Sequence, residues 1–243
     1  MSMSENSIND VYGKAMLDYY HGKKVKLLTY SSIAGKDELP LAHLFRSYEE
    51  MPALEQMALK LSKGKILDLG CGAGSHSICL EQNKLDVKSI DISPGAIEVC
   101  KLRGLKNVFS QDLWELKNEK FDTIIGLMNG IGICGTLIKL PAFLTHLKSL
   151  LTDNGQVLID SSDLVYMFED EEGEIDIPIS ESYYGEVQFY LEYEDQKSPK
   201  FDWLYVDYTK LETYAAEAGL NCEMICEGGH YDFLVRLSLK LQI

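Results

Sequence analysis

The chain has 243 residues, of which 46% are hydrophobic and 25% are charged, the balance of a globular protein with a substantial core. Its formal net charge of −15 repels phosphate backbones, so we expect no nucleic acid partner. The first twenty residues lack the apolar stretch of a signal peptide, and no apolar segment approaches the roughly 20 residues of a membrane helix. We therefore expect a cytoplasmic protein that does not contact a membrane.

The first 60 residues predict a helical cap that precedes the main domain. Apolar side chains recur at helical spacing from Val11 to Tyr20, from Leu41 to Phe45 and from Pro52 to Leu61. Pro52 suits the first turn of a helix, because that turn requires no amide hydrogen from it. We expect loops to join the three helices.

Between residues 65 and 160, short apolar segments alternate with helical ones. Lys65–Leu69 is an apolar run ended by glycines, which is typical of a strand buried on both faces. Further strands are expected at 86–91, 107–110, 121–127 and 156–160, and helices at 75–82, 93–102 and 141–151. Because strands and helices alternate, the sequence predicts a Rossmann-like, doubly wound α/β fold with a mostly parallel sheet.

The last part of the chain predicts an antiparallel ending to this sheet. Thr209–Glu212 matches a capping box, and Gly219 fits the residue that follows a helix. Two strands, 221–227 and 231–239, are joined by a pair of glycines. This hairpin brings the predicted sheet to seven strands, and the main domain extends over residues 61–243.

An insertion lies at about residues 162–208, after the fifth predicted strand. Apolar and polar residues alternate at 187–193 and at 201–205, which predicts an inserted β-hairpin. The insertion leaves the sheet at the carboxyl end of a strand, where open α/β sheets bind ligands. We expect it to cover the substrate.

The strongest functional signal is the segment Ile66–Gly74, with the sequence ILDLGCGAG. Its three alternating glycines allow positive φ and close approach of a ligand, and the following helix presents its amide groups to that ligand. Nicotinamide and flavin domains use a similar turn. Here, however, Ser75 and His76 stand where the longer fingerprint requires its last glycine, and Asp68 would repel a pyrophosphate. A ligand with an ammonium and a sulfonium but no phosphate suits this turn better.

In order and spacing, residues 65–160 resemble the cofactor-binding half of class I S-adenosylmethionine-dependent methyltransferases, and the final helix and hairpin resemble their usual ending. The resemblance implies S-adenosylmethionine as cofactor and transfer of its methyl group by in-line displacement. Because the donor is already activated, such a protein mainly aligns two reactants and excludes water.

The resemblance also implies cofactor contacts at the carboxyl ends of successive strands. Asp68 would lie near the methionine amino group, and Asp91 would accept both ribose hydroxyls, with Ile92 against the adenine. Asp112 would accept from the adenine amino group. The other implied contacts are Gly70, Cys71, Gly72 and Gly74 along the methionine and ribose, Gln111 and Leu113 at the adenine, and Leu127, Met128 and Asn129 beside the methionine part.

The segment Asp37–Arg46 resembles the leader of a largely uncharacterised microbial branch of these enzymes. The resemblance makes Arg46 a candidate for binding the cofactor carboxylate through two guanidinium nitrogens. A surface salt bridge is an equal alternative for this residue.

The sequence singles out no catalytic residue. If the acceptor carries a proton, a base must remove it, and His230, His76 and Tyr184 are weak candidates, together with His43. A lone histidine more often has a structural role.

The methyl acceptor is expected to be a small molecule. After the fourth strand the chain reads MNGIG, not the Asn-Pro-Pro-aromatic loop with which base-modifying enzymes hold a flipped base. From Asp163 to Asp195 there are twelve acids, no Lys or Arg, and several aromatic residues. An acidic aromatic pocket would favour an amine acceptor, although a solvated acidic loop is the simpler interpretation.

Two other functions fit parts of the sequence. A nicotinamide-dependent oxidoreductase would use a similar glycine turn, and a non-catalytic S-adenosylmethionine-binding regulatory protein would keep the whole cofactor site.

The six cysteines form no CxxC pair, so we expect free thiols and no metal site. The sequence does not indicate the oligomeric state.

Overall fold

The computed structural model describes residues 10–170, 172–177 and 182–240. The chain divides into two compact units, each built from three separate segments. The first unit comprises Met1–Pro52, Gly64–Lys117 and Gln188–Phe201, and the second comprises Ala53–Lys63, Asn118–Val187 and Asp202–Ile243. The two units are therefore interleaved along the sequence, and each is described by itself below.

The predicted seven-stranded sheet is present, with the strand order β11-β12-β7-β6-β3-β4-β5. β3 pairs with β4, β4 with β5 and β6 with β7 in parallel, whereas β12 runs antiparallel to both β7 and β11. The strands are β3 Lys65–Leu69, β4 Asp86–Asp91, β5 Val108–Ser110, β6 Phe121–Gly126, β7 Leu151–Ser162, β11 Leu220–Glu227 and β12 Asp232–Leu239. This arrangement confirms the predicted Rossmann-like α/β fold with an antiparallel C-terminal hairpin.

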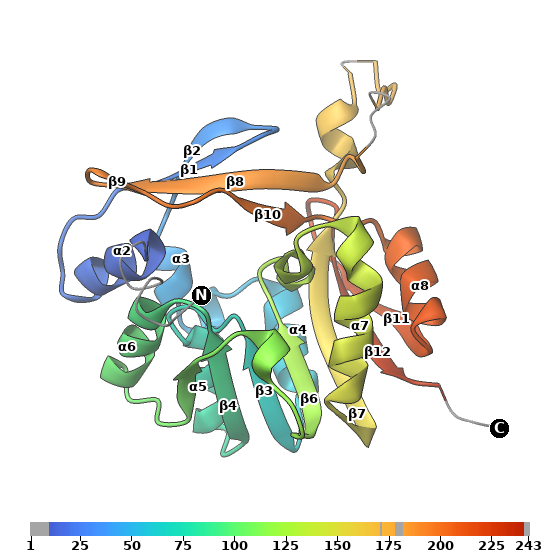
Figure 1. The fold of residues 1–243 in the computed structure, drawn as a ribbon, viewed down its shortest axis with the longest axis horizontal. Coiled ribbons are helices and arrows are strands. Elements are labelled where there is room, and N and C mark those ends of the chain that lie inside the picture. Colours follow the sequence, from blue (N-terminus) through green and yellow to red (C-terminus); the bar gives the residue numbers. More distant parts are fainter. Residues whose placement is uncertain (1–9, 171, 178–181, 241–243) are drawn as a thin grey trace. The chain divides into compact units, whose positions relative to one another are not determined.

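In the first unit, two helices pack on β4 and a third lies beside one of them (Figure 1). α5 (Ser75–Gln82) and α6 (Pro94–Leu102) both contact β4, and α2 (Val11–Tyr20) lies against α6. The start of α6 is as predicted, because Ser93 caps it through its hydroxyl and Pro94 occupies its first turn. A short helix, α3 (Ala42–Phe45), follows in the same unit.

Two glycines allow α2 and α6 to approach closely. A Cβ on Gly95 would lie 2.6 Å from the backbone of Gly13, closer than such atoms can come. Asp10 accepts from the Gly13 amide at 2.9 Å, and it also accepts from the Gly95 amide and the Ser93 hydroxyl, each at 2.8 Å. One carboxylate therefore caps two helices and holds α2 against α6.

A second sheet joins the N-terminal segment to the insertion. Its strand order is β10-β8-β1-β2, and β9 pairs with β8. β1 and β8 are antiparallel, with Tyr30 opposite Tyr190 and Ser31 opposite Phe189. The strands are β1 Leu27–Ser31, β2 Gly35–Leu39, β8 Glu186–Tyr193, β9 Gln196–Lys197 and β10 Phe201–Leu204. The inserted β-hairpin is thus present, and it continues into strands from the start of the chain.

Helices are present at the three positions predicted within residues 1–60, but the loop predicted between the first two is wrong at β1 and β2, which form an antiparallel hairpin. Thr29 and Tyr30 favour a strand, and Gly35 closes the turn with φ +70°, a conformation that suits glycine. Pairing with β8 then satisfies the other edge of β1. The division into a cap of residues 1–60 and a domain of residues 61–243 stays a prediction.

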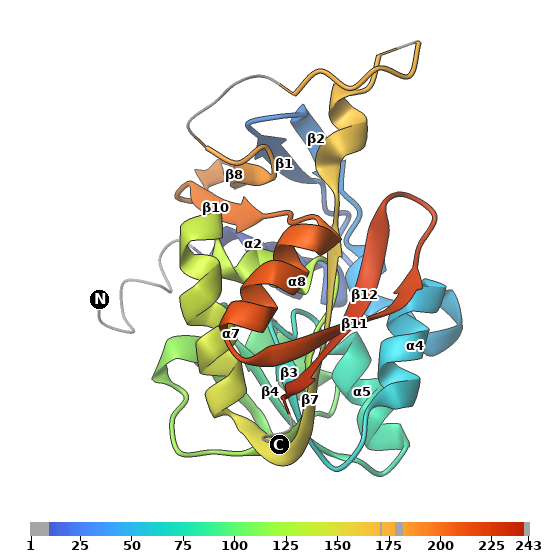
Figure 2. The same cartoon turned by 90° about the vertical axis from the view of Figure 1, so that its right-hand side faces the viewer.

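In the second unit, helices cover both faces of the strands. α7 (Leu140–Ser149) and α8 (Tyr208–Glu217) lie side by side on one face of β7, β12 and β11, whereas α4 (Ala53–Leu61) lies on the other (Figure 2). The predicted capping box at Thr209–Glu212 is wrong, because Asp207 caps α8 through the Lys210 amide at 2.9 Å. The short 3₁₀ helices of the chain are η2 Tyr48–Glu50, η3 Leu113–Glu115, η4 Gly130–Cys134, η5 Leu137–Lys139 and η6 Leu164–Phe168.

Over the described residues, none of the helices combines the length and the apolar character that crossing a membrane requires.

Candidate functional site

The glycine turn between β3 and α5 has a backbone that only glycine adopts easily. Gly70, Gly72 and Gly74 have φ angles of +72°, +53° and +82°. A Cβ on Gly74 would also lie 2.6 Å from Leu105. Both the backbone conformation and the packing behind the turn therefore require glycine at this position.

Cys71 lies between these glycines with its side chain turned into the protein. It is buried, and its thiol is 3.9 Å from that of Cys100 on α6. The Cys100 thiol and burial together hold the pKa of Cys71 well above its ordinary value. Cys71 can therefore face a ligand only through its backbone.

Asp68 is a buried carboxylate near the end of β3. Ser77 on α5 donates a hydrogen bond of 2.5 Å to one of its oxygens, and Ser77 is in turn 2.6 Å from the Ser89 hydroxyl. Burial raises the pKa of Asp68, because the charged form loses contact with water. A cationic group on a ligand would compensate that loss, so the position suits an ammonium.

Asp91 ends β4 and turns its carboxylate toward the glycine turn. One oxygen accepts from the Gly72 amide at 2.9 Å, and the other accepts from the Ser93 amide at 2.8 Å. Burial nevertheless raises the pKa of Asp91 to about 6. Each oxygen keeps a further lone pair for a hydroxyl donor. The next residue, Ile92, is 67% exposed, which leaves an apolar side chain available to cover a flat ligand.

Asp112 follows β5, the strand next to β4. One of its oxygens accepts from the Trp114 amide at 3.0 Å and so caps η3, which leaves its second oxygen for a ligand. Gln111 is tied to Asp91 by a backbone hydrogen bond of 2.9 Å, and Leu113 is buried. The residues predicted to contact the adenine therefore lie beside the residue predicted to bind the ribose.

Tyr12 on α2 is a residue of this site that the sequence did not indicate. Its hydroxyl is 3.8 Å from the position that a Cβ on Gly72 would occupy. Burial, and to a lesser extent the Asp91 carboxylate, strongly raise the pKa of its phenol, so it remains a hydrogen-bond donor at neutral pH. No motif marks Tyr12, because its place depends on the packing of α2 against α6.

Arg103 stabilises the glycine turn through hydrogen bonds on the side that packs into the protein. Its guanidinium donates to the Ala73 carbonyl at 2.6 Å and to the Ser75 hydroxyl at 3.1 Å. Ser75 in turn donates to the Leu44 carbonyl at 2.7 Å. The segment that ends in Arg46 is thereby tied to the glycine turn, and Arg46 follows two residues after this tie.

The first unit thus gathers most of the predicted cofactor contacts around the carboxyl ends of three neighbouring strands. These residues are Asp68, Gly70, Cys71, Gly72, Gly74, Asp91, Ile92, Gln111, Asp112 and Leu113, with Arg46 in the same unit. The remaining three, Leu127, Met128 and Asn129, belong to the second unit.

The loop after β6 in the second unit is strained. Met128 and Asn129 are consecutive non-glycine residues with φ of +66° and +61°. The side-chain amide of Asn129 donates to the Leu204 carbonyl at 3.1 Å, and the backbone amide of Gly130 donates to the Asp160 carboxylate at 2.8 Å. Among the described residues, Asn129 Oδ1 is a buried acceptor with no hydrogen-bond partner.

The structure does not bring the predicted catalytic candidates together. His76 is buried on α5 in the first unit, whereas Tyr184 and His230 belong to the second. The Tyr184 hydroxyl donates to Asp163 at 2.7 Å, and burial strongly raises the pKa of its phenol, so it stays protonated at neutral pH. His230 is exposed in the turn between β11 and β12.

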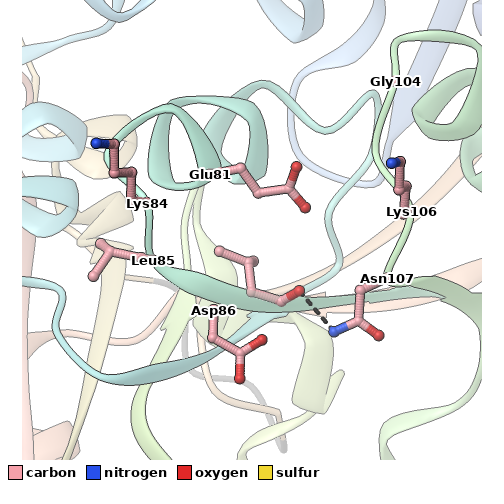
Figure 3. A pocket seen from close by; sticks show the side chains of 8 residues that line it. Glu81, Lys84, Leu85, Asp86, Gly104, Lys106 and Asn107 are labelled. Carbon is pink, nitrogen blue, oxygen red and sulfur yellow. Dashed lines mark hydrogen bonds between the residues drawn. The ribbon is translucent and has the colours of Figure 1, made fainter.

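A surface hollow of about 380 Å³ lies at the other end of β4 (Figure 3). It is lined by Asp86, the first residue of that strand, and by Asn107, which donates to the Val87 carbonyl at 2.8 Å. The glycine turn contacts the last residue of the strand, Asp91. The hollow is therefore separate from the candidate site.

Comparison with known proteins assigns these features to a family. Residues 42–241 match the family described as a methyltransferase domain. The crystal structure of an S-adenosylmethionine-dependent methyltransferase from Bacteroides fragilis, in complex with S-adenosyl-L-homocysteine, is 45% identical and covers 97% of each chain with a TM-score of 0.89. The chain belongs to the class I S-adenosylmethionine-dependent methyltransferases.

More distant structures share only the fold of this methyltransferase. The CcbJ methyltransferase from Streptomyces caelestis is 12% identical and covers 95% of this chain and 98% of its own, with a TM-score of 0.62. The PH0226 protein from Pyrococcus horikoshii is 24% identical and covers 77% and 88%, with a TM-score of 0.59.

One curated relative is named as a methyltransferase of ribosomal RNA. Ribosomal RNA small subunit methyltransferase C from Shewanella sediminis is 35% identical over 119 residues. The match covers 46% of this methyltransferase, and the chain spans 32% of the length of that relative.

Membership of the family decides which ligand the glycine turn binds. S-adenosylmethionine is the cofactor of this methyltransferase, and the nicotinamide-dependent and non-catalytic alternatives are set aside. The buried Asp68 carboxylate, the ends of β4 and β5 and the exposed Ile92 fit the charge and shape of this cofactor. The contact of each individual residue stays a prediction.

Proposed function

We propose that this methyltransferase transfers a methyl group to a small-molecule acceptor, and that the first unit holds the donor at the carboxyl ends of β3, β4 and β5. The observation that supports the donor site is the position of Asp68, Asp91 and Asp112 at or just beyond the carboxyl ends of three neighbouring parallel strands. The cofactor has an ammonium, a pair of ribose hydroxyls and an adenine amino group, so it offers one donor group to each acid.

The surrounding residues would bind the rest of the donor. Ile92 covers the adenine, Arg46 pairs with the methionine carboxylate, and Tyr12 places a hydroxyl donor beside the glycine turn. When bound, S-adenosylmethionine supplies a methyl group that is already activated for displacement. The residues of the chain therefore bind, orient and exclude water.

Proton removal from the acceptor does not fall to Tyr184 in this proposal. Its phenol already donates to Asp163, and a phenol with a strongly raised pKa is a poor base at neutral pH. Asn129 Oδ1 is better suited to orient an acceptor, because it is a buried hydrogen-bond acceptor on a strained loop. His76 and His230 stay weak candidates.

The acids nearest the tyrosines of the insertion already have partners. Asp163 accepts from Tyr184 at 2.7 Å, and Asp207 accepts from Tyr183 at 2.8 Å and caps α8. These hydrogen bonds favour a structural role for both acids over the binding of a cationic acceptor. The preference for an amine acceptor stays a prediction with less support.

The charge of the whole chain favours a small acceptor. A net charge of −15 opposes the approach of a phosphate backbone. A ribosomal RNA acceptor is the second candidate, because the relative from Shewanella sediminis carries that name and is 35% identical over 119 residues.

The donor site is tested by calorimetry with S-adenosylhomocysteine. We expect Asp91→Ala to weaken binding by about a hundredfold, because it removes an acceptor of two hydroxyls. Asp86→Ala is the matched control, since it removes a carboxylate at the opposite end of β4. Equal affinities for the two variants would contradict the donor site.

The acceptor class is tested by measuring the formation of S-adenosylhomocysteine. The purified protein is supplied with a panel of small amines, phenols and carboxylic acids, and separately with small ribosomal subunits that lack their methyl groups. We expect turnover with small molecules. Turnover with the ribosomal subunits alone would establish the second candidate instead.

A further inference from the structure

Two cysteine thiols meet directly beneath the glycine turn. Cys71 lies within the turn, Cys100 lies on α6, and their sulfur atoms are 3.9 Å apart. Both are free thiols, and both belong to a buried apolar cluster that includes Ile97 and Leu105. Packing therefore already holds the two sulfurs close to the separation of about 2.05 Å that a disulfide bond requires.

The Cys100 thiol also helps to shape the glycine turn. It donates to the Gly72 carbonyl, with a sulfur–oxygen distance of 3.2 Å. It fills the space beside Gly74 as well, because a Cβ on that glycine would lie 2.9 Å from the sulfur. The amide of Gly72 donates to the Asp91 carboxylate. Through Gly72, the state of the Cys100 sulfur is therefore linked to the carboxylate proposed to bind the ribose.

A bond between the two sulfurs would change the turn in two ways. The sulfur atoms would move about 1.9 Å closer together, and Cys71 belongs to a turn and not to a helix or strand, so the turn is the part that yields. Cys100 would also lose its hydrogen and with it the hydrogen bond to the Gly72 carbonyl. Both changes displace the backbone that carries Gly72, so we expect weaker binding of the cofactor.

We propose that Cys71 and Cys100 form a reversible oxidation site, at which a peroxide converts the two thiols to a disulfide and so weakens cofactor binding. The proposal concerns the regulation of the donor site and rests on the proposed position of that site. Its support is the contact between the two sulfurs and the hydrogen bond from Cys100 to the turn.

The reaction balances with one molecule of hydrogen peroxide. One cysteine, as its thiolate, attacks a peroxide oxygen, so that the oxygen–oxygen bond breaks, hydroxide leaves and a sulfenic acid remains. The sulfur of the second cysteine then attacks the sulfenic sulfur, and the sulfur–oxygen bond breaks. With the two thiol protons, the products are the disulfide and two molecules of water. A dithiol reductant reverses the reaction by thiol–disulfide exchange.

Burial makes the oxidation depend on local opening of the turn. Cys71 is 6% exposed, and the pKa of its thiol is held well above the ordinary value. Peroxide therefore reaches the pair when the turn opens, which a bound cofactor opposes. Linkage requires the same relation at equilibrium, because a disulfide that weakens cofactor binding must itself be disfavoured by the cofactor.

The test measures the binding of S-adenosylhomocysteine by calorimetry to the reduced protein, after hydrogen peroxide, and after renewed reduction with dithiothreitol. Peptide mass spectrometry locates the disulfide. We expect a bond between Cys71 and Cys100, about tenfold weaker binding while it is present, and full recovery on reduction. In a buffer of oxidised and reduced dithiothreitol, saturating S-adenosylhomocysteine should shift the equilibrium of the pair toward the thiols by the same factor of about ten.

Cys100→Ser is the informative variant, because its hydroxyl can still donate to the Gly72 carbonyl but cannot form a disulfide. Its affinity should be the same before and after peroxide. Cys79→Ser is the matched control, since Cys79 is a buried cysteine on α5 in the same unit, and this variant should keep the sensitivity of the parent. The cycle of oxidation and reduction in the parent needs no variant, so it tests the proposal even if Cys100→Ser folds poorly.

Three outcomes overturn the oxidation site and leave the donor site intact: no bond between Cys71 and Cys100, a bond that leaves the affinity unchanged, or an equal loss of affinity in Cys100→Ser. A reduced parent that does not bind S-adenosylhomocysteine would contradict the donor site itself, and the oxidation site with it.

Discussion

The pKa of the Asp91 carboxylate is shifted in opposite directions by burial and by hydrogen bonds. Burial raises its pKa to about 6, while the Ser93 and Gly72 amides lower it. Hydroxyl donors of the ribose would bind the charged form, which predominates above that pKa. The proton and the cofactor therefore compete for the same oxygens.

We expect S-adenosylhomocysteine to bind about tenfold more weakly near pH 5 than near pH 8, because one proton must leave Asp91 before the ligand binds. Calorimetry across this range measures the effect. Asp91→Asn should bind weakly and show little dependence on pH, whereas Asp86→Asn should keep the dependence of the parent. An Asp91→Asn variant with the full pH dependence would assign the effect to another group.

Arg103 acts on the cofactor through other residues. Arg103→Met removes the hydrogen bonds to Ala73 and Ser75 and so loosens the glycine turn. We expect affinity for S-adenosylhomocysteine to fall by about tenfold, with partial recovery in Arg103→Lys. Arg236→Met is the control, because Arg236 makes comparable bonds to Gln156 and Glu223 in the second unit. Equal losses of affinity would mean that Arg103 only stabilises the fold.

At the scale of elements, the contact between α2 and α6 depends on two glycines and one capping acid. Gly95→Ala would place a methyl group against the backbone of Gly13 and force the helices apart. We expect a cost of about 1–3 kcal/mol, which lowers Tm by about 5 °C in a chain of this size. Weaker binding of S-adenosylhomocysteine should follow, since Tyr12 moves with α2.

Thermal unfolding checks this expectation, with Gly229→Ala as the control. No atom lies within 4 Å of a Cβ built at Gly229, so that variant should unfold like the parent. If Gly95→Ala had the Tm of Gly229→Ala, the two helices would not be locked as described.

The elements of the seven-stranded sheet were predictable because their signals are local. Lys65–Leu69 is a largely apolar run, and Ser93 followed by Pro94 marks the start of a helix. β1 and β2 were not predictable in this way. Most side chains of these strands are half-buried or exposed, and β1 is completed by β8, which lies far along the sequence.

The same distinction holds for the candidate site. Asp68, Asp91 and Asp112 could be identified because each lies at a strand end near a recognisable turn. Tyr12 and Arg103 could not, because their roles come from contacts made through packing and not from a motif. Tertiary structure therefore adds the residues that hold the donor site in shape.

At the scale of the whole molecule, binding of the cofactor should stabilise the fold by mass action. At a concentration of S-adenosylhomocysteine one hundred times its Kd, the expected gain is about 2.7 kcal/mol. This gain corresponds to a rise in Tm of about 5–10 °C. A thermal shift measurement tests it, with NADH as the control ligand. A larger shift with NADH would contradict the assignment of the cofactor.

The pairing of β1 with β8 has a consequence for when the protein can fold during its synthesis. Tyr30 on β1 donates to Glu192 on β8, 162 residues later in the chain. During synthesis at about 5–20 residues per second, the first strand waits on the order of ten seconds for its partner. The packing of α2 is likewise completed only when Tyr193 has left the ribosome. We therefore expect nascent chains to bind the cofactor only late in synthesis, after the strand that completes the first unit has emerged.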